Sequence, residues 1–145
     1  MPAEGSIEHL ADVSAWNEWR RQSFRSWVNL SGADLRDADL GGVNLRNAEL
    51  AGADLREANL AGADLVQANL SDANLSGVNL REARLGGANL SEADLSEADL
   101  LHAILVLANM RKSKMQKQNQ LESNLFAASV READLSEADL TGARV

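Results

Sequence analysis

Leucine stands at every fifth position from Leu30 to Leu105 without a miss. The same spacing continues at Met110, Met115, Leu125, Val130, Leu135, Leu140 and Val145. On an α-helix, a step of five residues turns successive side chains by about 140°, which scatters them over every face. In a flat strand, an odd step sends successive side chains to opposite faces. The chain must therefore turn once in every five residues, so that each short extended piece presents its leucine to the same interior.

The positions around each leucine fit this geometry. Alanine stands two residues before 18 of the 24 leucine positions, and Asp or Asn stands between the two in 18 of the 24. Residues two apart in an extended chain share a face, so the alanine and the leucine both point inward, while Asp and Asn favour turns. Glycine often stands second after the leucine, where a turn needs a positive φ. Because Glu57 and Glu92 replace it, we expect that not every turn needs this conformation.

The pattern, for example Ala33-Asp34-Leu35-Arg36-Asp37, resembles the pentapeptide-repeat family over residues 28–145. The resemblance implies an all-β fold, a right-handed quadrilateral parallel β-helix with one repeat per side and 20 residues per coil. The repeats then make about six coils, a rod roughly 29 Å long at about 4.8 Å per coil. Its structural core is a stack of leucines that includes Leu35, Leu55, Leu75, Leu95 and Leu135.

Residues 1–27 differ in composition and are expected to form a capping helix and a link. Apolar residues at helical spacing predict one amphipathic helix from Ser6, as its N-cap, to Gln22. Trp16, Trp19 and Trp27 all lie in this region. A lid over the first coil is the expected role, since terminal repeats need capping, and a tryptophan-rich recognition element is the alternative. The segment 15–20 also resembles leaders that precede the repeats in bacterial members of the family.

Residues 111–120 interrupt the leucine pattern and suggest an inserted loop. A 20-residue coil, however, places each of the chain's three lysines between two acids; Lys114, for example, lies between Asp94 and Asp134. An extruded loop would have no reason to match this spacing. We therefore expect the coil to form through Lys117, with an irregularity only near 118–120.

The outward residues differ among the four sides of the expected coil, which we name after their first leucines, Leu30, Leu35, Leu40 and Leu45. The Leu35 side carries eight acids in two rows: Asp34, Asp54, Asp94, Asp134 and Asp37, Glu57, Glu97, Glu137. The Leu45 side carries only Asp64 among acids. It presents an apolar patch instead, with two members at the adjoining corner: Val66, Ile104, Val106, Leu107, Phe126, Leu101 and Leu121. An exposed apolar patch usually marks a contact surface.

No catalytic residue, cofactor site or metal site is expected. The chain has no Cys and no Tyr, and its serines occupy repeated surface positions without a partnered base. His102, between Glu82 and Glu122 in the coil, is the one candidate metal ligand, and a solvated His–Glu stack is the preferred interpretation. A net charge of −8 argues against direct nucleic-acid binding. The chain has no cysteine for a disulfide framework, no signal peptide and no membrane-length apolar run, so we expect a cytoplasmic protein.

Taken together, these features predict a non-enzymatic solenoid that acts as a protein-interaction or scaffold module. The expected partner is another protein or a second copy, bound through the apolar side or through the end at Val145, where no cap is expected to cover the last coil. The alternative follows from the resemblance: some pentapeptide-repeat proteins imitate DNA and so modulate type II topoisomerases such as DNA gyrase. The acidic rows of the Leu35 side would serve that role.

Overall fold

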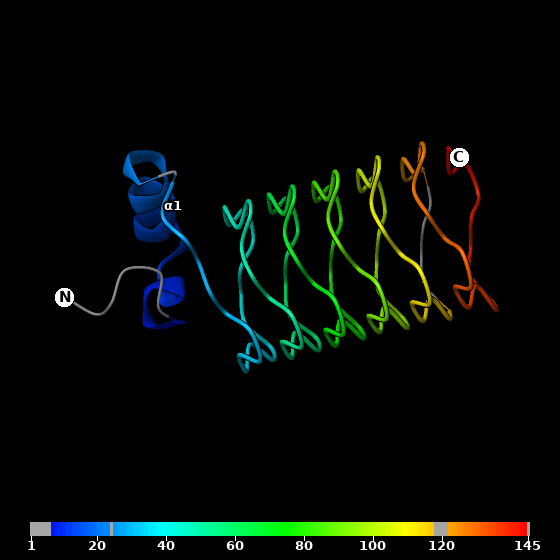
Figure 1. The fold of residues 1–145 in the computed structure, drawn as a ribbon, viewed down its shortest axis with the longest axis horizontal. Coiled ribbons are helices and arrows are strands. Elements are labelled where there is room, and N and C mark those ends of the chain that lie inside the picture. Colours follow the sequence, from blue (N-terminus) through cyan, green and yellow to red (C-terminus); the bar gives the residue numbers. More distant parts are fainter. Residues whose placement is uncertain (1–6, 24, 118–121, 145) are drawn as a thin grey trace.

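The computed structural model describes residues 7–23, 25–117 and 122–144. A 3-10 helix, η1 (Ile7–Ala11), and an α-helix, α1 (Val13–Gln22), precede the repeats. Figure 1 shows both helices at one end of a stack of regular coils. Within the described residues, no helix is long and apolar enough to cross a lipid bilayer.

The expectation of one continuous helix up to Gln22 is wrong, because a break at Asp12 separates η1 from α1. Asp12 has extended backbone angles, and its side chain accepts a hydrogen bond of 2.9 Å from the Ala15 N–H. This bond satisfies one of the free N–H groups at the start of α1, which is the N-cap role that Asp performs well. Ser6 lies outside the described residues.

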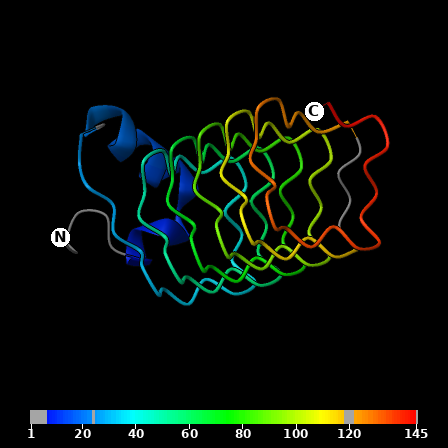
Figure 2. The ribbon, with the colours of Figure 1, turned by 45° about the vertical axis from the view of Figure 1, so that its right-hand side comes forward.

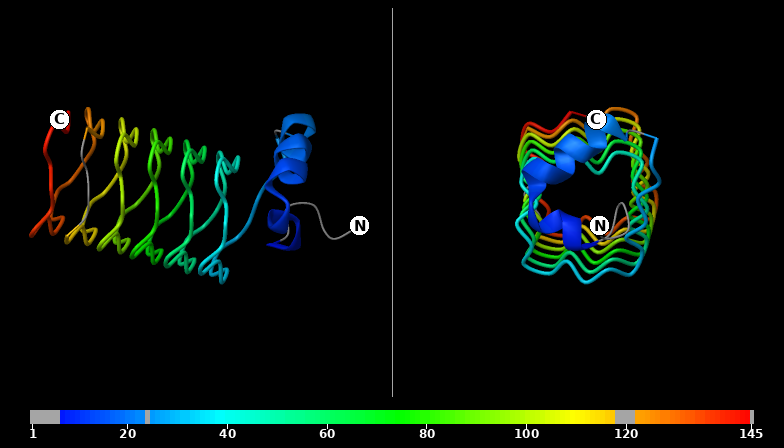
Figure 3. Two further views of the ribbon diagram at one scale, coloured as in Figure 1. Left: turned by 180° about the vertical axis from the view of Figure 1, so that it is seen from behind. Right: turned by 90° about the vertical axis from the view of Figure 1, so that its left-hand side faces the viewer.

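The repeats form a parallel β-helix that makes one turn in 20 residues. Each side contributes one bridging residue per coil, and the bridges join residues 20 apart on all four sides: Asn29 to Glu49, Asp34 to Asp54, Asp39 to Asn59 and Asn44 to Asp64. Viewed along its axis, the stack has a four-sided outline (Figure 3, right), and the coils lie in register along the rod (Figure 2). The period of five thus becomes a quadrilateral solenoid.

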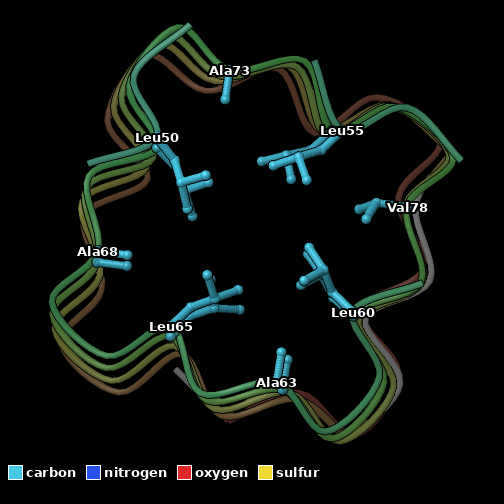
Figure 4. Close-up of a cluster of buried hydrophobic side chains, with 14 of the residues drawn as sticks. Leu50, Leu55, Leu60, Ala63, Leu65, Ala68, Ala73 and Val78 are labelled. Atoms are coloured by element: carbon cyan, nitrogen blue, oxygen red, sulfur yellow. The ribbon is translucent and has the colours of Figure 1, made fainter. Parts of the chain in front are cut away.

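The interior is a stack of leucine and alanine. Leu50, Leu55, Leu60 and Leu65 point toward the centre from the four sides of one coil (Figure 4). The expected core residues Leu35, Leu55, Leu75 and Leu95 are buried. Leu135 is only partly buried, because no described coil lies beyond it.

Every turn among the described residues has the left-handed conformation, so the expectation that some turns do not need it is wrong. All described residues at the second position after the leucine have φ between 54° and 69°, whether or not they are glycine. Glu57 has φ 58° and Glu92 has φ 60°. A left-handed backbone costs a residue with a Cβ roughly 1–2 kcal/mol. The hydrogen bonds between coils hold these residues in that conformation all the same.

Residues 111–117 lie within the coil. Lys114 bridges to both Asp94 and Asp134, and its Nζ lies 3.5 Å from an Asp94 carboxylate oxygen. The Lys112 N–H donates to the Arg131 carbonyl at 3.0 Å. The expected irregularity at 118–120 lies outside the described residues.

Helix α1 bonds to the exposed backbone edge of the first coil. The indole Nε1 of Trp16 donates to the Asn44 carbonyl at 2.8 Å, and the Asn17 side chain accepts from the Asn44 N–H at 2.7 Å. The guanidinium of Arg20 donates to the Arg46 carbonyl at 2.8 Å. In later coils, the equivalent backbone groups bond to the coil before. Three side chains of α1 therefore replace the missing coil on the Leu45 side.

We expect Trp16→Phe to destabilise the protein by about 1–3 kcal/mol, because it leaves the Asn44 carbonyl without its donor while retaining a buried ring. Trp16→Ala should cost about 3–5 kcal/mol, since it also creates a cavity. Urea unfolding followed by circular dichroism measures both effects. Trp27→Phe is the control, because Trp27 is 70% exposed and should change little. A Trp16→Ala protein as stable as the wild type would show that α1 does not stabilise the rod.

Candidate interaction faces

The apolar patch lies on adjacent coils of the Leu45 side. Ile104 bridges to Arg84 on one side and to Asn124 on the other. The Leu107 N–H donates to the Phe126 carbonyl at 3.1 Å, so the corners that carry these two residues are stacked. Ile104 is 42% exposed, Leu107 65% and Phe126 63%. The structure therefore places three large exposed apolar side chains together in successive coils.

The remaining predicted patch residues that the structure describes are less exposed than Ile104, Leu107 and Phe126. Val106 and Val66 are half-buried in one row, separated by Gly86. Leu101 is half-buried at the preceding corner. Leu121 lies outside the described residues. We use the name apolar patch for Val66, Leu101, Ile104, Val106, Leu107 and Phe126.

Leu107 combines exposure with a strained backbone. Its φ is 61°, in the region that disfavours side chains with a Cβ. Some equivalent turns hold glycine, such as Gly87 in the coil before, and most of the others hold a polar residue. The sequence analysis did not predict this backbone conformation for Leu107. Leu107 is the second residue after Leu105, so its position in the repeat would have indicated the conformation if the turn type had been known.

Charged residues lie beside the patch and are partly compensated. The Asp64 carboxylate lies 3.2 Å from the Arg46 guanidinium and 3.1 Å from that of Arg84. Arg144, in the same outward row, is exposed. The Leu45 side is thus apolar at its centre and arginine-bearing toward both ends.

The acidic rows of the Leu35 side are stacked as the 20-residue coil predicts. In the first two coils, however, arginines partly neutralise the charge of Asp34 and Asp54. The Arg36 guanidinium lies 2.6 Å from an Asp34 oxygen and 3.8 Å from an Asp54 oxygen, and Arg56 lies 2.6 Å from Asp54. The hydrogen bonds from Arg36 lower the pKa of Asp34 to about 2, and those from Arg56 lower the pKa of Asp54. The signal was present in the sequence, because Asp and Arg two residues apart share a face.

The other half of the acidic side is also interrupted. Asp94 and Asp134 flank Lys114, and Gln116 donates to Asp134 at 2.6 Å. The second row occupies the left-handed turn positions and is exposed: Asp37, Glu57, Glu97 and Glu137. The structure therefore brings the predicted acids onto one side but leaves that side with alternating charge.

His102 is part of a small surface cluster without metal-site geometry. Its Nδ1 lies 3.5 Å from a Glu122 carboxylate oxygen, and both side chains are largely exposed. Among the residues that the structure describes, no group of three His, Cys, Asp or Glu residues could hold a metal ion. The arrangement is a solvated His–Glu contact.

The last described coil leaves apolar side chains uncovered. Val130 and Leu140 stand at leucine positions, yet both are exposed, because no described residues pack on that end. Val145 lies outside the described residues.

Comparison with known proteins identifies the repeat. A family model described as pentapeptide repeats matches in eight copies, over residues 26–60, 53–91, 73–112 and 122–145. No curated protein sequence matches significantly.

Solved structures of pentapeptide-repeat proteins resemble this one. A trypsin-treated form of QnrB1, a plasmid-mediated fluoroquinolone resistance protein, superposes with a TM-score of 0.71 at 25% identity, over 81% of this chain and 58% of that one. HetL, involved in heterocyst differentiation regulation in Nostoc sp. strain PCC 7120, gives a TM-score of 0.48 at 30% identity, over 82% of this chain and 64% of that one. The chain thus spans less than two thirds of the length of either protein. Because the family model covers most of the sequence and the 20-residue coil carries its repeats, the chain belongs to the pentapeptide-repeat family.

Proposed function

We propose that this protein is a non-enzymatic, cytoplasmic, right-handed rod of about six coils that binds another protein through the apolar patch. The observation that carries this proposal is Leu107, which is 65% exposed at a φ of 61°. Every described turn has this left-handed φ, but most hold glycine or a polar residue. A large exposed apolar side chain at such a corner gains little from burial in the isolated rod, and exposed apolar patches mark contact surfaces.

The surroundings of Leu107 suit a protein partner. Interfaces combine an apolar centre with a polar, solvent-accessible rim. Ile104, Val106 and Phe126 supply the centre, while Arg84 and Arg144 in the same outward row supply charged groups toward the rim. Phe126 is a large ring in a position to act as an anchor, and aromatic residues are enriched at the centres of interfaces.

We expect Leu107→Asn to weaken partner binding while stabilising the isolated rod by about 0.5–1 kcal/mol, because Asn adopts the left-handed conformation at lower cost. Urea unfolding gives the stability. Binding is followed with a photo-crosslinking amino acid at position 106, with and without Leu107→Asn, in cells that make the protein. Crosslinked products are then resolved by mass.

Two controls accompany this experiment. Gln67→Asn changes the same turn position in the same row, where φ is also 61°, and should alter stability without reducing the crosslink. The crosslinker at position 96, the equivalent corner on the Leu35 side, should give no product. Loss of stability in Leu107→Asn with an unchanged crosslink would mean that Leu107 serves the fold, and the patch would lose its assignment.

Modulation of a type II topoisomerase by DNA mimicry is the second candidate. The structural likeness to QnrB1, a fluoroquinolone resistance protein, favours it, as do the stacked acids of the Leu35 side. The ion pairs of Arg36 and Arg56 weaken it, because they neutralise Asp34 and Asp54. A rod of roughly 29 Å also matches only about eight or nine base pairs of DNA.

If DNA mimicry operates, the protein should inhibit or protect DNA gyrase in a supercoiling assay, and the effect should disappear in a variant with Asp54→Asn, Glu57→Gln, Asp94→Asn and Glu97→Gln. The matched control removes the same charge from the Leu40 side, with Asp39→Asn, Glu82→Gln, Asp99→Asn and Glu122→Gln. Equal loss in both variants would indicate a general charge effect. Absence of any effect from the wild-type protein would exclude gyrase as its target.

A further inference from the structure

The outward residues of the Leu45 side are ordered so that they complement the same residues of a second copy that runs in the opposite direction. One row runs Asp64, Arg84, Ile104, Asn124 and Arg144, joined by successive bridges. A second row, at the corner, runs Val66, Gly86, Val106 and Phe126. We propose that the partner of the apolar patch is a second copy of this chain, packed antiparallel with its two-fold axis at the level of Ile104. This inference rests on the proposed function and names its partner.

A two-fold axis in the plane of the interface, perpendicular to the rod, places each row against the same row of the other copy in the opposite direction. Ile104 then meets Ile104 of the partner subunit, and Val106 meets Val106 of the partner subunit. Both rows share this centre because residues 104 and 106 belong to one side of one coil. The most apolar part of the face therefore packs against itself.

The corner row supplies a projection and a matching hollow at equal distances from the centre. Phe126 lies one coil beyond Val106 and is 63% exposed. Gly86 lies one coil before Val106 and has no side chain. A Cβ added at Gly86 would lie 3.9 Å from the Val66 side chain and 3.8 Å from the Val106 carbonyl. In the antiparallel pair, the partner subunit's Phe126 faces Gly86 and fits between Val66 and Val106.

Charge selects the antiparallel over the parallel arrangement. In the antiparallel pair, Arg84 faces Asn124 of the partner subunit, and Asp64 faces Arg144 of the partner subunit. A parallel pair has its two-fold axis along the rod. With that axis on the row of Ile104 and the coils level, Arg84 would face Arg84 of the partner subunit and Asp64 would face Asp64 of the partner subunit. Like charges placed opposite one another at an interface are unfavourable. The pattern of one acid, one arginine, an apolar centre and a second arginine thus fits a reversed copy.

The test uses the purified chain and its concentration-dependent mass. Sedimentation equilibrium should show exchange between the 15.6 kDa monomer and a species of twice that mass. Gly86→Leu should weaken association by roughly tenfold or more, because it fills the hollow. The fold accepts this change, since a Cβ at Gly86 makes only ordinary contacts and its φ is not positive. Ser76→Leu, the same corner position on the Leu35 side, is the control and should have no effect.

A compensating variant separates a direct contact from a general disturbance. Gly86→Leu combined with Phe126→Ala exchanges the projection and the hollow, and it should recover part of the association that Gly86→Leu loses. Circular dichroism confirms that each variant keeps the fold. Failure of the double variant to recover, with both single variants folded, would overturn the contact between residues 86 and 126.

Crosslinking tests the register, and the chain contains no cysteine to interfere. Facing sheets lie about 10 Å apart, beyond disulfide reach, so a short bis-maleimide is used. A mixture of Asp64→Cys and Arg144→Cys chains should give a crosslinked dimer, because these residues face one another in the antiparallel pair. Asp64→Cys alone should not, because its two copies then lie four coil spacings, about 19 Å, apart along the rod. Crosslinking of Asp64→Cys with itself would show a parallel pair and overturn the proposal.

The mass of the protein in solution and the crosslink from position 106 together distinguish self-association from binding of a different protein. A monomer at every concentration, together with a crosslink from position 106 to a different protein in cells, would overturn self-association and leave the patch as a docking face. A monomer without any crosslink from position 106 would overturn both. A reversible dimer that Gly86→Leu dissociates supports both.

Discussion

The hydrogen bonds between backbones 20 residues apart are the constraint on which the rest of this structure depends. Each coil donates to and accepts from its neighbours: the Leu35 N–H donates to the Asp54 carbonyl at 2.8 Å, and the Asp54 N–H donates to the Ala33 carbonyl at 2.9 Å. Buried backbone groups must be paired, and this register pairs them only if the chain turns once per repeat. The leucine stack, the left-handed turns and the docking of α1 on the first coil all follow from that requirement.

The same register determines which residues lie together on the surface of the rod. Residues that repeat with a spacing of 20 form a line along one side, so a few acids make an acidic row and a few apolar residues make a patch. This is why the chain can carry different chemistry on opposite sides of a narrow rod. The Leu35 side alternates acids with Arg36, Arg56 and Lys114, whereas the Leu45 side is apolar at its centre. The apolar side exposes Ile104, Leu107 and Phe126 to solvent, whereas ion pairs partly neutralise the acids of the Leu35 side. Burial by a partner would therefore stabilise the apolar side more.

The turn position of Leu107 differs from the others in its side chain and not in its backbone. At most turns the left-handed position holds glycine or a polar residue, for which exposure costs little. Leu107 has the same φ, which the coil imposes, but a large exposed apolar side chain. A binding face accounts for a leucine at this position. The hollow at Gly86 and the projecting Phe126 make that face complementary in shape to a second copy. The order of residues along the face favours antiparallel packing of the two copies.

The period of five in the sequence was enough to predict a chain that turns once per repeat and buries its leucines. The resemblance to the pentapeptide-repeat family supplied the four sides, and with them the side on which each acid or apolar residue lies. Other features came only from the tertiary structure. It broke the N-terminal helix at Asp12, buried Arg20 against the Arg46 carbonyl, left Leu135 partly exposed and forced Glu57 and Leu107 into left-handed turns. The physical reason is that caps, coil ends and strained turns depend on how whole segments dock on one another, and a local pattern of residue types does not specify that docking.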